Sequence, residues 1–184
     1  MKKIGFLGLG VMGLPMAKNV IKGTKQAIMG FDVAQNRLDE LKEAGGIPVK
    51  DPDEIYRSCD IIMQMLPTHA TIIHSVERAI ELGKPGNIII DCSSTAPDII
   101  QELYAKTKAA GMTLLDSPVS GGNPMAIAGT LAIMTGGDKE AFDEVLPILE
   151  SMGKPVYTGK SGSGDVTKLV NNMIAGNMLT AIAE

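Results

Sequence analysis

The sequence predicts an α/β fold with a doubly wound, mostly parallel sheet. Two observations lead to it: short, continuously apolar runs alternate with helix-like stretches along the 184 residues, and a glycine-rich turn joins the first run to the first such stretch. Strands buried on both faces of a parallel sheet consist of such runs, whereas strands with one wet face alternate polar and apolar residues. The runs lie at 4–7, 27–31, 61–66, 88–90 and 113–115, with further strand candidates at 131–135 and 155–157.

Helix-like stretches fill the gaps between these runs. They are expected at 11–22, 34–44, 69–82, 97–110 and 138–152, and segments rich in Gly and Pro separate several of them from the next strand. Strands that alternate with helices in this way form a parallel sheet with helices on both faces. The two later strand candidates extend this sheet past its usual sixth strand.

The turn after the first run has the spacing Gly8-x-Gly10-x-x-Gly13, which suits a dinucleotide pyrophosphate. Gly8 permits a tight turn, Gly10 lets the backbone approach the phosphates, and Gly13 lets the helix pack closely on the strand. The helix start adds free N–H groups and a positive dipole end. The cofactor-binding residues expected in this Rossmann-type turn are Gly8, Leu9, Gly10, Val11, Met12 and Gly13.

The second apolar run ends in Asp32, about twenty residues beyond the glycines, where dinucleotide-binding folds place an acid. A carboxylate there accepts hydrogen bonds from the adenosine ribose and repels a 2′-phosphate, so the sequence favours NAD over NADP. The alternative is that Asp32 caps the helix that begins near Ala34. The order of strand, glycine turn, helix, strand and acid favours the ribose role. We therefore expect residues 1–162 to form an NAD-binding domain.

Composition and charge argue against several kinds of partner. The net charge is −4, the pI is near 5.2 and no basic tract is present, which argues against nucleic-acid binding. No stretch approaches about eighteen uninterrupted apolar residues, so no membrane partner is expected. Cys59 and Cys92 match no metal or redox spacing, which favours buried thiols in a reducing, cytoplasmic setting. His69 and His74 lack the spacing of a zinc site, so no metal is expected.

Polar segments follow the apolar runs at 61–66, 88–90 and 113–115, and ligands of open α/β sheets bind at this carboxyl edge. Hydroxyls and free amides in 91–97 suit a ribose, a nicotinamide amide or a carboxylate. Ser94 or Thr95 could equally cap a helix that starts at Pro97, and both possibilities stay open. Ser120-Gly-Gly leads into no obvious tight hairpin, which favours a binding role there.

Lys168 and Asn172 lie four residues apart and would share one helix face. A partly desolvated lysine has a lowered pKa and can act as an acid at neutral pH. A lysine that merely extends its stem along an apolar surface is the commoner case, so the residues alone leave both roles open. The helix expected at 168–184 is apolar nearly all round and lacks a stop signal. We expect 163–184 to begin an interdomain helix of a truncated chain whose next domain is absent.

Four segments, at 8–19, 91–97, 118–122 and 162–172, together resemble the β-hydroxyacid dehydrogenase family, of the 3-hydroxyisobutyrate dehydrogenase and 2-hydroxy-3-oxopropionate reductase type. The resemblance covers essentially the whole chain. It implies that Lys168 is the catalytic lysine and that Asn172 assists it on the substrate. It also implies substrate contacts at Ser120, Gly121, Gly122 and Asn171, and further NAD contacts at Leu66, Pro67, Ser94 and Thr95.

The reaction implied by this resemblance is hydride transfer between nicotinamide C4 and the hydroxyl-bearing carbon of a small carboxylate substrate, with Lys168 as general acid and base. Family members continue into an all-helical domain that usually builds a dimer, so a homo-oligomer is expected of the full-length protein. Three alternatives remain: a catalytically silent NAD-binding module, a glyoxylate or succinic semialdehyde reductase, and a sugar-phosphate dehydrogenase. The last would need a phosphate site, and no basic cluster lies near Ser120 in the sequence.

Overall fold

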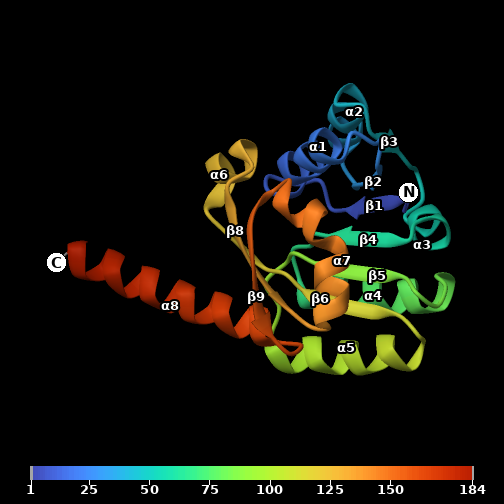
Figure 1. Ribbon diagram of the computed structural model, residues 1–184. Coiled ribbons are helices and arrows are strands. Elements are labelled where there is room, and N and C mark those ends of the chain that lie inside the picture. Colours follow the sequence, from blue (N-terminus) through green and yellow to red (C-terminus); the bar gives the residue numbers. More distant parts are fainter. Residues whose placement is uncertain (1, 184) are drawn as a thin grey trace.

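The structure, a computed structural model, describes residues 2–183 and contains one sheet of nine strands with helices on both faces (Figure 1). Six strands follow the order β3-β2-β1-β4-β5-β6, and all neighbours among them are parallel. They are β1 (Ile4–Leu7), β2 (Met29–Phe31), β3 (Ile47–Pro48), β4 (Ile61–Gln64), β5 (Ile88–Asp91) and β6 (Thr113–Asp116). The predicted doubly wound, Rossmann-type sheet is confirmed.

Three further strands extend the sheet beyond β6, of which β8 and β9 were predicted and β7 was not. They are β7 (Val119–Ser120), β8 (Leu131–Gly136) and β9 (Gly153–Gly159). β8 runs antiparallel to β6 and β7, whereas β9 is parallel to β8. The sheet is therefore mostly parallel, and the strand direction reverses between β7, which contains Ser120, and β8.

The helices form two layers around this sheet. On one face α1 (Gly13–Thr24), α2 (Gln35–Glu43) and α7 (Lys139–Glu150) contribute to one apolar core, and on the other α3 (Asp53–Ser58), α4 (His69–Leu82) and α5 (Pro97–Ala109) contribute to a second. Successive strand residues alternate between these cores: Ile61 and Met63 belong to the first and Ile62 to the second. Because side chains of a strand point alternately to opposite faces, a strand covered on both sides is mostly apolar, and the buried polar residues Gln64, Asp91 and Asp116 lie only at strand ends.

Four short elements were not predicted: β3, α3, β7 and α6 (Gly122–Ala128). Each has seven residues or fewer, which is too short for a clear hydrophobic period. The run expected as a strand at 61–66 pairs with its neighbours only as far as Gln64. Met65 and Leu66 already belong to the loop at the carboxyl edge.

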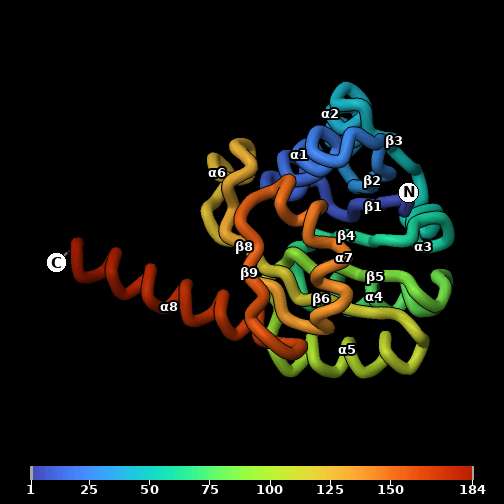
Figure 2. The backbone as a smooth tube through the Cα atoms, in the orientation of Figure 1, coloured from blue at the N-terminus to red at the C-terminus, as the bar shows by residue number. Residues whose placement is uncertain are grey.

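The last helix, α8 (Ser163–Ala183), includes residues 168–183 of the apolar stretch that was expected to be helical and begins five residues before that stretch. Figure 2 shows α8 in red, extending away from the sheet, and its apolar side chains beyond the first turn are exposed. Glu184, the expected last residue of this helix, lies outside the described residues, as does Met1. Among the helices of residues 2–183, none combines the length and apolarity that a bilayer span requires.

Candidate active site

The glycine turn between β1 and α1 has the geometry that its spacing predicts. Gly8 has a φ of +86°, and a Cβ at Gly13 would overlap the carbonyl oxygen of Gly8. No atom lies within 4 Å of the position of a Cβ on Gly10. Gly8 and Gly13 are therefore required by the turn itself, whereas Gly10 leaves open space for an approaching group.

Asp32 connects this turn to the end of β2. One carboxylate oxygen accepts a hydrogen bond from the backbone N–H of Leu9 at 2.6 Å, and the other accepts one from Ala34 at 2.9 Å. Ala34 is the N-cap residue of α2, so Asp32 binds just before the helix and does not cap it directly. The ribose role of Asp32 stays a prediction.

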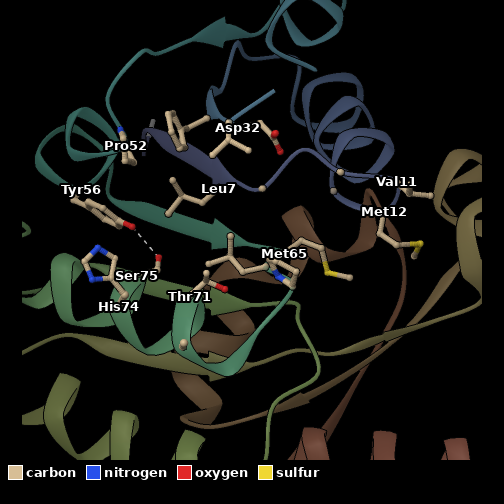
Figure 3. Close-up of a pocket in the computed structure, with 18 residues that line it drawn as sticks. Leu7, Val11, Met12, Asp32, Pro52, Tyr56, Met65, Thr71, His74 and Ser75 are labelled. Carbon is tan, nitrogen blue, oxygen red and sulfur yellow. Dashed lines mark hydrogen bonds between the residues drawn. The ribbon is translucent and has the colours of Figure 1, made fainter. Parts of the chain in front are cut away.

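A cavity of about 860 Å³ opens beside the turn (Figure 3). Eight of the residues predicted to bind the cofactor line it: Gly8, Gly10, Val11, Met12, Gly13, Asp32, Leu66 and Pro67. Leu9 is buried and does not line this cavity, and Ser94 and Thr95 are absent from its walls. The cavity therefore gathers most of the predicted cofactor residues, from three separate loops.

Part of the cavity wall consists of residues that the sequence did not predict. Tyr56 from α3 and His74 and Ser75 from α4 face the cavity, with Pro52 beside them (Figure 3). The hydroxyls of Tyr56 and Ser75 are 2.8 Å apart and share a hydrogen bond. No sequence signal could have placed Tyr56 here, because α3 is only six residues long and shows no helical period.

The segment 91–97 folds around the buried carboxylate of Asp91. One oxygen of Asp91 accepts the N–H of Ser93 at 3.1 Å and the other accepts the hydroxyl of Thr95 at 2.9 Å. Burial raises the pKa of Asp91. The N-cap residue of α5 is Ala96, which has no side-chain cap, so the alternative in which Ser94 or Thr95 caps this helix is wrong. Ser94 is exposed and Thr95 is buried.

The Ser93 hydroxyl joins this segment to the cavity. It accepts a hydrogen bond from the backbone N–H of Leu66 at 2.9 Å. Because Leu66 lines the cavity, the loops after β4 and β5 are held together at the same edge of the sheet.

The segment Ser120-Gly121-Gly122 connects β7 to α6. Gly121 has a φ of +133° and Gly122 a φ of +69°, conformations that L side chains rarely adopt. The side-chain amide of Asn123 then donates a hydrogen bond to the carbonyl of Val11 at 2.7 Å. This bond brings the predicted substrate segment against the predicted cofactor turn.

α8 carries the predicted catalytic residues. The side-chain amide of Asn171 donates a hydrogen bond to the hydroxyl of Ser120 at 3.1 Å. Lys168 is half-buried, and this burial lowers the pKa of its ammonium group. Asn172 is exposed, and within residues 2–183 its side chain makes no hydrogen bond. The structure thus joins Ser120 to Asn171, whereas Asn172 shares only the helix with Lys168.

Two buried aspartates, Asp116 and Asp165, were missed as site residues. Asp116, at the end of β6, accepts hydrogen bonds from the backbone N–H groups of Gly162, Gly164 and Asp165 at 2.8 to 3.2 Å. Asp165 in turn accepts the N–H of Thr95 at 2.9 Å. Burial raises the pKa of Asp116, and burial raises that of Asp165 to about 7. An acid directly after a buried strand was the available sequence signal for Asp116.

Within residues 2–183, no group of three or more His, Cys, Asp or Glu side chains is arranged to hold a metal ion. The two cysteines, Cys59 and Cys92, are buried and unpaired. Burial raises the pKa of the Cys59 thiol to about 11. Both side chains therefore pack as small apolar groups in the core, as expected.

The fold and the cavity define a dinucleotide-binding domain of the Rossmann type. The family model described as the NAD binding domain of 6-phosphogluconate dehydrogenase matches residues 3–162. The chain belongs to the β-hydroxyacid dehydrogenase family, and NAD is the cofactor of the matched domain.

Similar proteins carry related names. The chain is 35% identical to an NAD-dependent L-serine dehydrogenase of Pseudomonas aeruginosa, over all of the chain and 63% of that protein. It is 37% identical to a probable mitochondrial 3-hydroxyisobutyrate dehydrogenase of Dictyostelium discoideum, over all of the chain and 58% of that protein. The structure of a Mycobacterium tuberculosis 3-hydroxyisobutyrate dehydrogenase with L-serine matches with a TM-score of 0.94 at 34% identity, over all of the chain and 63% of its own. The chain thus spans about three fifths of the length of these relatives.

Proposed function

We propose that the complete protein is an NAD-dependent oxidoreductase that interconverts a small β-hydroxyacid and its semialdehyde, of the 3-hydroxyisobutyrate or 2-hydroxy-3-oxopropionate type. One observation carries the proposal: the hydrogen bond from Asn171 to Ser120 brings the helix of a half-buried lysine, Lys168, onto the segment that contacts the glycine turn. In this proposal, these two hydrogen bonds bring the acid-base and carboxylate-binding groups towards the cofactor turn.

Each group has a role in this proposal. NAD, when bound, supplies the carbon that exchanges the hydride with the substrate. Lys168 accepts the hydroxyl proton in oxidation and donates it in reduction, and burial lowers its pKa in the direction that this role requires. The backbone amides of 120–122 and the Asn171 amide hold the substrate carboxylate and fix its orientation, while Asn172 assists from the same helix as Lys168.

The cofactor-binding part of the proposal rests on the cavity beside the glycine turn. The open space at Gly10 admits a pyrophosphate to the start of α1, where N–H groups are free to bind it. The cavity beyond it is mostly apolar where Tyr56 and Pro52 form its wall, which suits an adenine ring. Asp32 lies between these parts, where the ribose would bind. Leu9, Ser94 and Thr95 would support the cofactor from outside this cavity.

L-Serine is a second candidate substrate, because it is itself a β-hydroxyacid and relatives are named for it or contain it. It differs from 3-hydroxyisobutyrate by an ammonium group in place of a methyl group. Glyoxylate and succinic semialdehyde remain further candidates of the same chemistry. A catalytically silent module would have no use for a desolvated lysine at 168. A sugar-phosphate substrate would need a basic cluster near Ser120.

We further propose a domain organisation and a setting for the protein. Residues 1–162 form the NAD-binding domain, and residues 163–184 begin a helix that leads into a helical domain and a homo-oligomer. The exposed apolar side chains of α8 support this assignment, since they need cover. Unpaired, buried cysteines favour the cytoplasm.

A substrate panel on the complete protein tests the proposed activity. Oxidation of 3-hydroxyisobutyrate, L-serine and other small hydroxyacids is measured with NAD and with NADP, for the wild type and for Lys168→Ala. We expect Lys168→Ala to lower kcat by about 10²- to 10⁴-fold while the dissociation constant of NAD stays unchanged. The matched control is Lys160→Ala, which removes an exposed lysine near the same helix start.

Two outcomes would contradict the proposal. Turnover of the best substrate by Lys168→Ala at the wild-type rate would exclude the lysine as acid and base. NAD binding without turnover of any panel member would favour the silent module.

A further inference from the structure

α8 is attached to the rest of the described chain almost entirely through its first turn. Only Gly164 and Asp165 are buried among the residues of this helix. Apolar side chains further along it are exposed, from 46% at Leu169 to 79% at Ile182. Hydrophobic burial within residues 2–183 therefore does little to fix the helix, and polar contacts do so instead: those of its first turn and, further along, the Asn171–Ser120 hydrogen bond.

Asp116 supplies the first of these contacts. Its carboxylate accepts the backbone N–H groups of Gly162, Gly164 and Asp165, which are donors at a helix start that lack partners within the helix. A negative charge at this end also interacts favourably with the helix dipole. Three hydrogen bonds from one carboxylate define both the position and the direction of the first turn.

Glycine at two positions makes room for this carboxylate. A Cβ at Gly136 or at Gly164 would lie 2.8 Å from an oxygen of Asp116, closer than a carbon and an oxygen can approach without displacement. The backbones of β8 and α8 can thus both pass next to Asp116. The motif Gly162-Ser-Gly164 therefore serves the approach of the helix to Asp116, in addition to any contact with a ligand.

Asp165 supplies the second contact, in which the carboxylate belongs to the helix and its hydrogen-bond donor lies outside the helix. Its carboxylate extends from the helix and accepts the N–H of Thr95, in the loop that follows β5. One aspartate thus binds from the sheet to the helix and the other from the helix to the sheet. Because one attachment reaches the end of β6 and the other the loop after β5, they restrain rotation of the helix start as well as its translation.

We propose that Asp116 and Asp165 are positioning residues that hold Lys168 in place over the substrate segment. The proposal rests on the proposed function, in which Lys168 is the general acid and base. Lys168 lies three residues beyond Asp165, which corresponds to about 4.5 Å along the helix axis. A shift of the first turn is therefore transmitted to Lys168 almost in full, and a displacement of about 1 Å can lower a rate by about 100-fold.

The test compares graded substitutions at both aspartates in the complete protein. Asp116→Ala removes the acceptor for all three N–H groups, whereas Asp116→Asn can keep the two that share one oxygen. We expect kcat to fall by about 100-fold for alanine and by about 10-fold for asparagine. For the Asp116 variants, the dissociation constant of NAD should stay within about twofold, because Asp116 neither lines the cofactor cavity nor binds a residue assigned to the cofactor. The apparent pKa in the kcat–pH profile of Asp116→Ala should rise, because a more exposed Lys168 loses part of the desolvation that lowers its pKa.

A second pair covers the case in which Asp116→Ala does not fold. Asp165→Ala removes the acceptor for Thr95, whereas Asp165→Asn keeps an oxygen there. We expect alanine to lower kcat by about 10-fold and asparagine to restore it. The matched control is Asp138→Asn, which alters a carboxylate that binds Tyr104 and Lys108 and, within residues 2–183, makes no hydrogen bond to α8.

Amide hydrogen exchange separates failure of this proposal from failure of the proposed function. If the wild type turns over no substrate, the proposed function fails, and exchange at Gly162, Gly164 and Asp165 still reports on the positioning role. Asp116→Ala should accelerate exchange there and leave the Leu9 amide unchanged. Unchanged exchange, unchanged kcat in both alanine variants, or equal losses in kcat and NAD affinity would each overturn the proposal.

Discussion

The side chain of Asn171 binds the hydroxyl of Ser120 across a sequence separation of 51 residues. Through this bond a helix that is otherwise exposed reaches the segment that precedes α6. Asn123, at the start of α6, reaches in turn to the glycine turn at Val11. The predicted substrate and cofactor residues are therefore joined by two hydrogen bonds from side-chain amides.

Removal of the Asn171–Ser120 bond should affect the substrate more than the cofactor. We expect Asn171→Ala and Ser120→Ala each to raise KM for the hydroxyacid by about 10-fold, equivalent to about 1.4 kcal/mol. The double variant should lose less than the sum of the two single losses, because each single change already breaks the shared bond. Steady-state kinetics on all four proteins measures this coupling. Fully additive losses would mean that the two side chains act independently.

Asp32 should determine the choice between NAD and NADP. Asp32→Ser removes the negative charge that would repel a 2′-phosphate, so the ratio of the NADP to the NAD dissociation constant should fall by about 10-fold or more. NAD binding itself should weaken, because the acceptor for the Leu9 and Ala34 amides is lost. Calorimetric titration with each cofactor gives both constants. An unchanged ratio would restrict Asp32 to its contacts within the turn.

Gly10 and Gly13 should respond differently to the same substitution. Gly10→Ala meets no atom within 4 Å, so the protein should fold with an unchanged melting temperature and lose NAD affinity, because the new methyl group occupies the approach to the turn. Gly13→Ala should lower the free energy of unfolding by about 1 to 3 kcal/mol, because its Cβ overlaps the carbonyl of Gly8. Thermal unfolding and NAD titration of both variants test this contrast. Full NAD affinity in Gly10→Ala would contradict it.

Asp165 should make stability depend on pH in the direction opposite to most carboxylates. Its pKa is raised to about 7 in the fold, chiefly by burial and further by the nearby charges of Asp91 and Asp116, whereas an unfolded aspartate titrates near 3.9. Between about pH 4 and pH 7 the folded state binds the extra proton. The contribution of Asp165 to the free energy of unfolding is thus greatest below about pH 4. It is lost as the pH rises through 7, by up to about 1.4 kcal/mol per pH unit.

Asp165→Asn provides the comparison for this pH dependence. Asparagine keeps an acceptor for Thr95 and cannot titrate, so the difference in the free energy of unfolding between wild type and variant should change across this pH window. Denaturant unfolding at pH 4.5, 6 and 7.5 measures it. If the difference in the free energy of unfolding stayed constant, the pKa of Asp165 would not be raised in the folded protein.

Much of the architecture follows from local physical rules. The apolar runs at 4–7 and 88–90 correspond to strands, because a strand covered on both faces has few positions for a polar side chain. The helices expected at 69–82 and 97–110 end within one residue of their expected bounds, where Gly and Pro punctuate the chain. α8 begins five residues before its apolar stretch, and its first turn is stabilised by Asp116 and not by an apolar period.

The candidate site likewise contains residues that the sequence identified and contacts that only the structure showed. The glycine turn and Asp32 could be identified from the sequence, because their chemistry depends on residues that are close along the chain. The sequence alone also identified Lys168 and Ser120 as candidates. Only the tertiary structure decided that Asn171 binds Ser120, that Asp116 binds the start of α8, and that Tyr56 forms a wall of the cavity. These contacts depend on strand order and on loops that meet at one edge of the sheet, which no local pattern encodes.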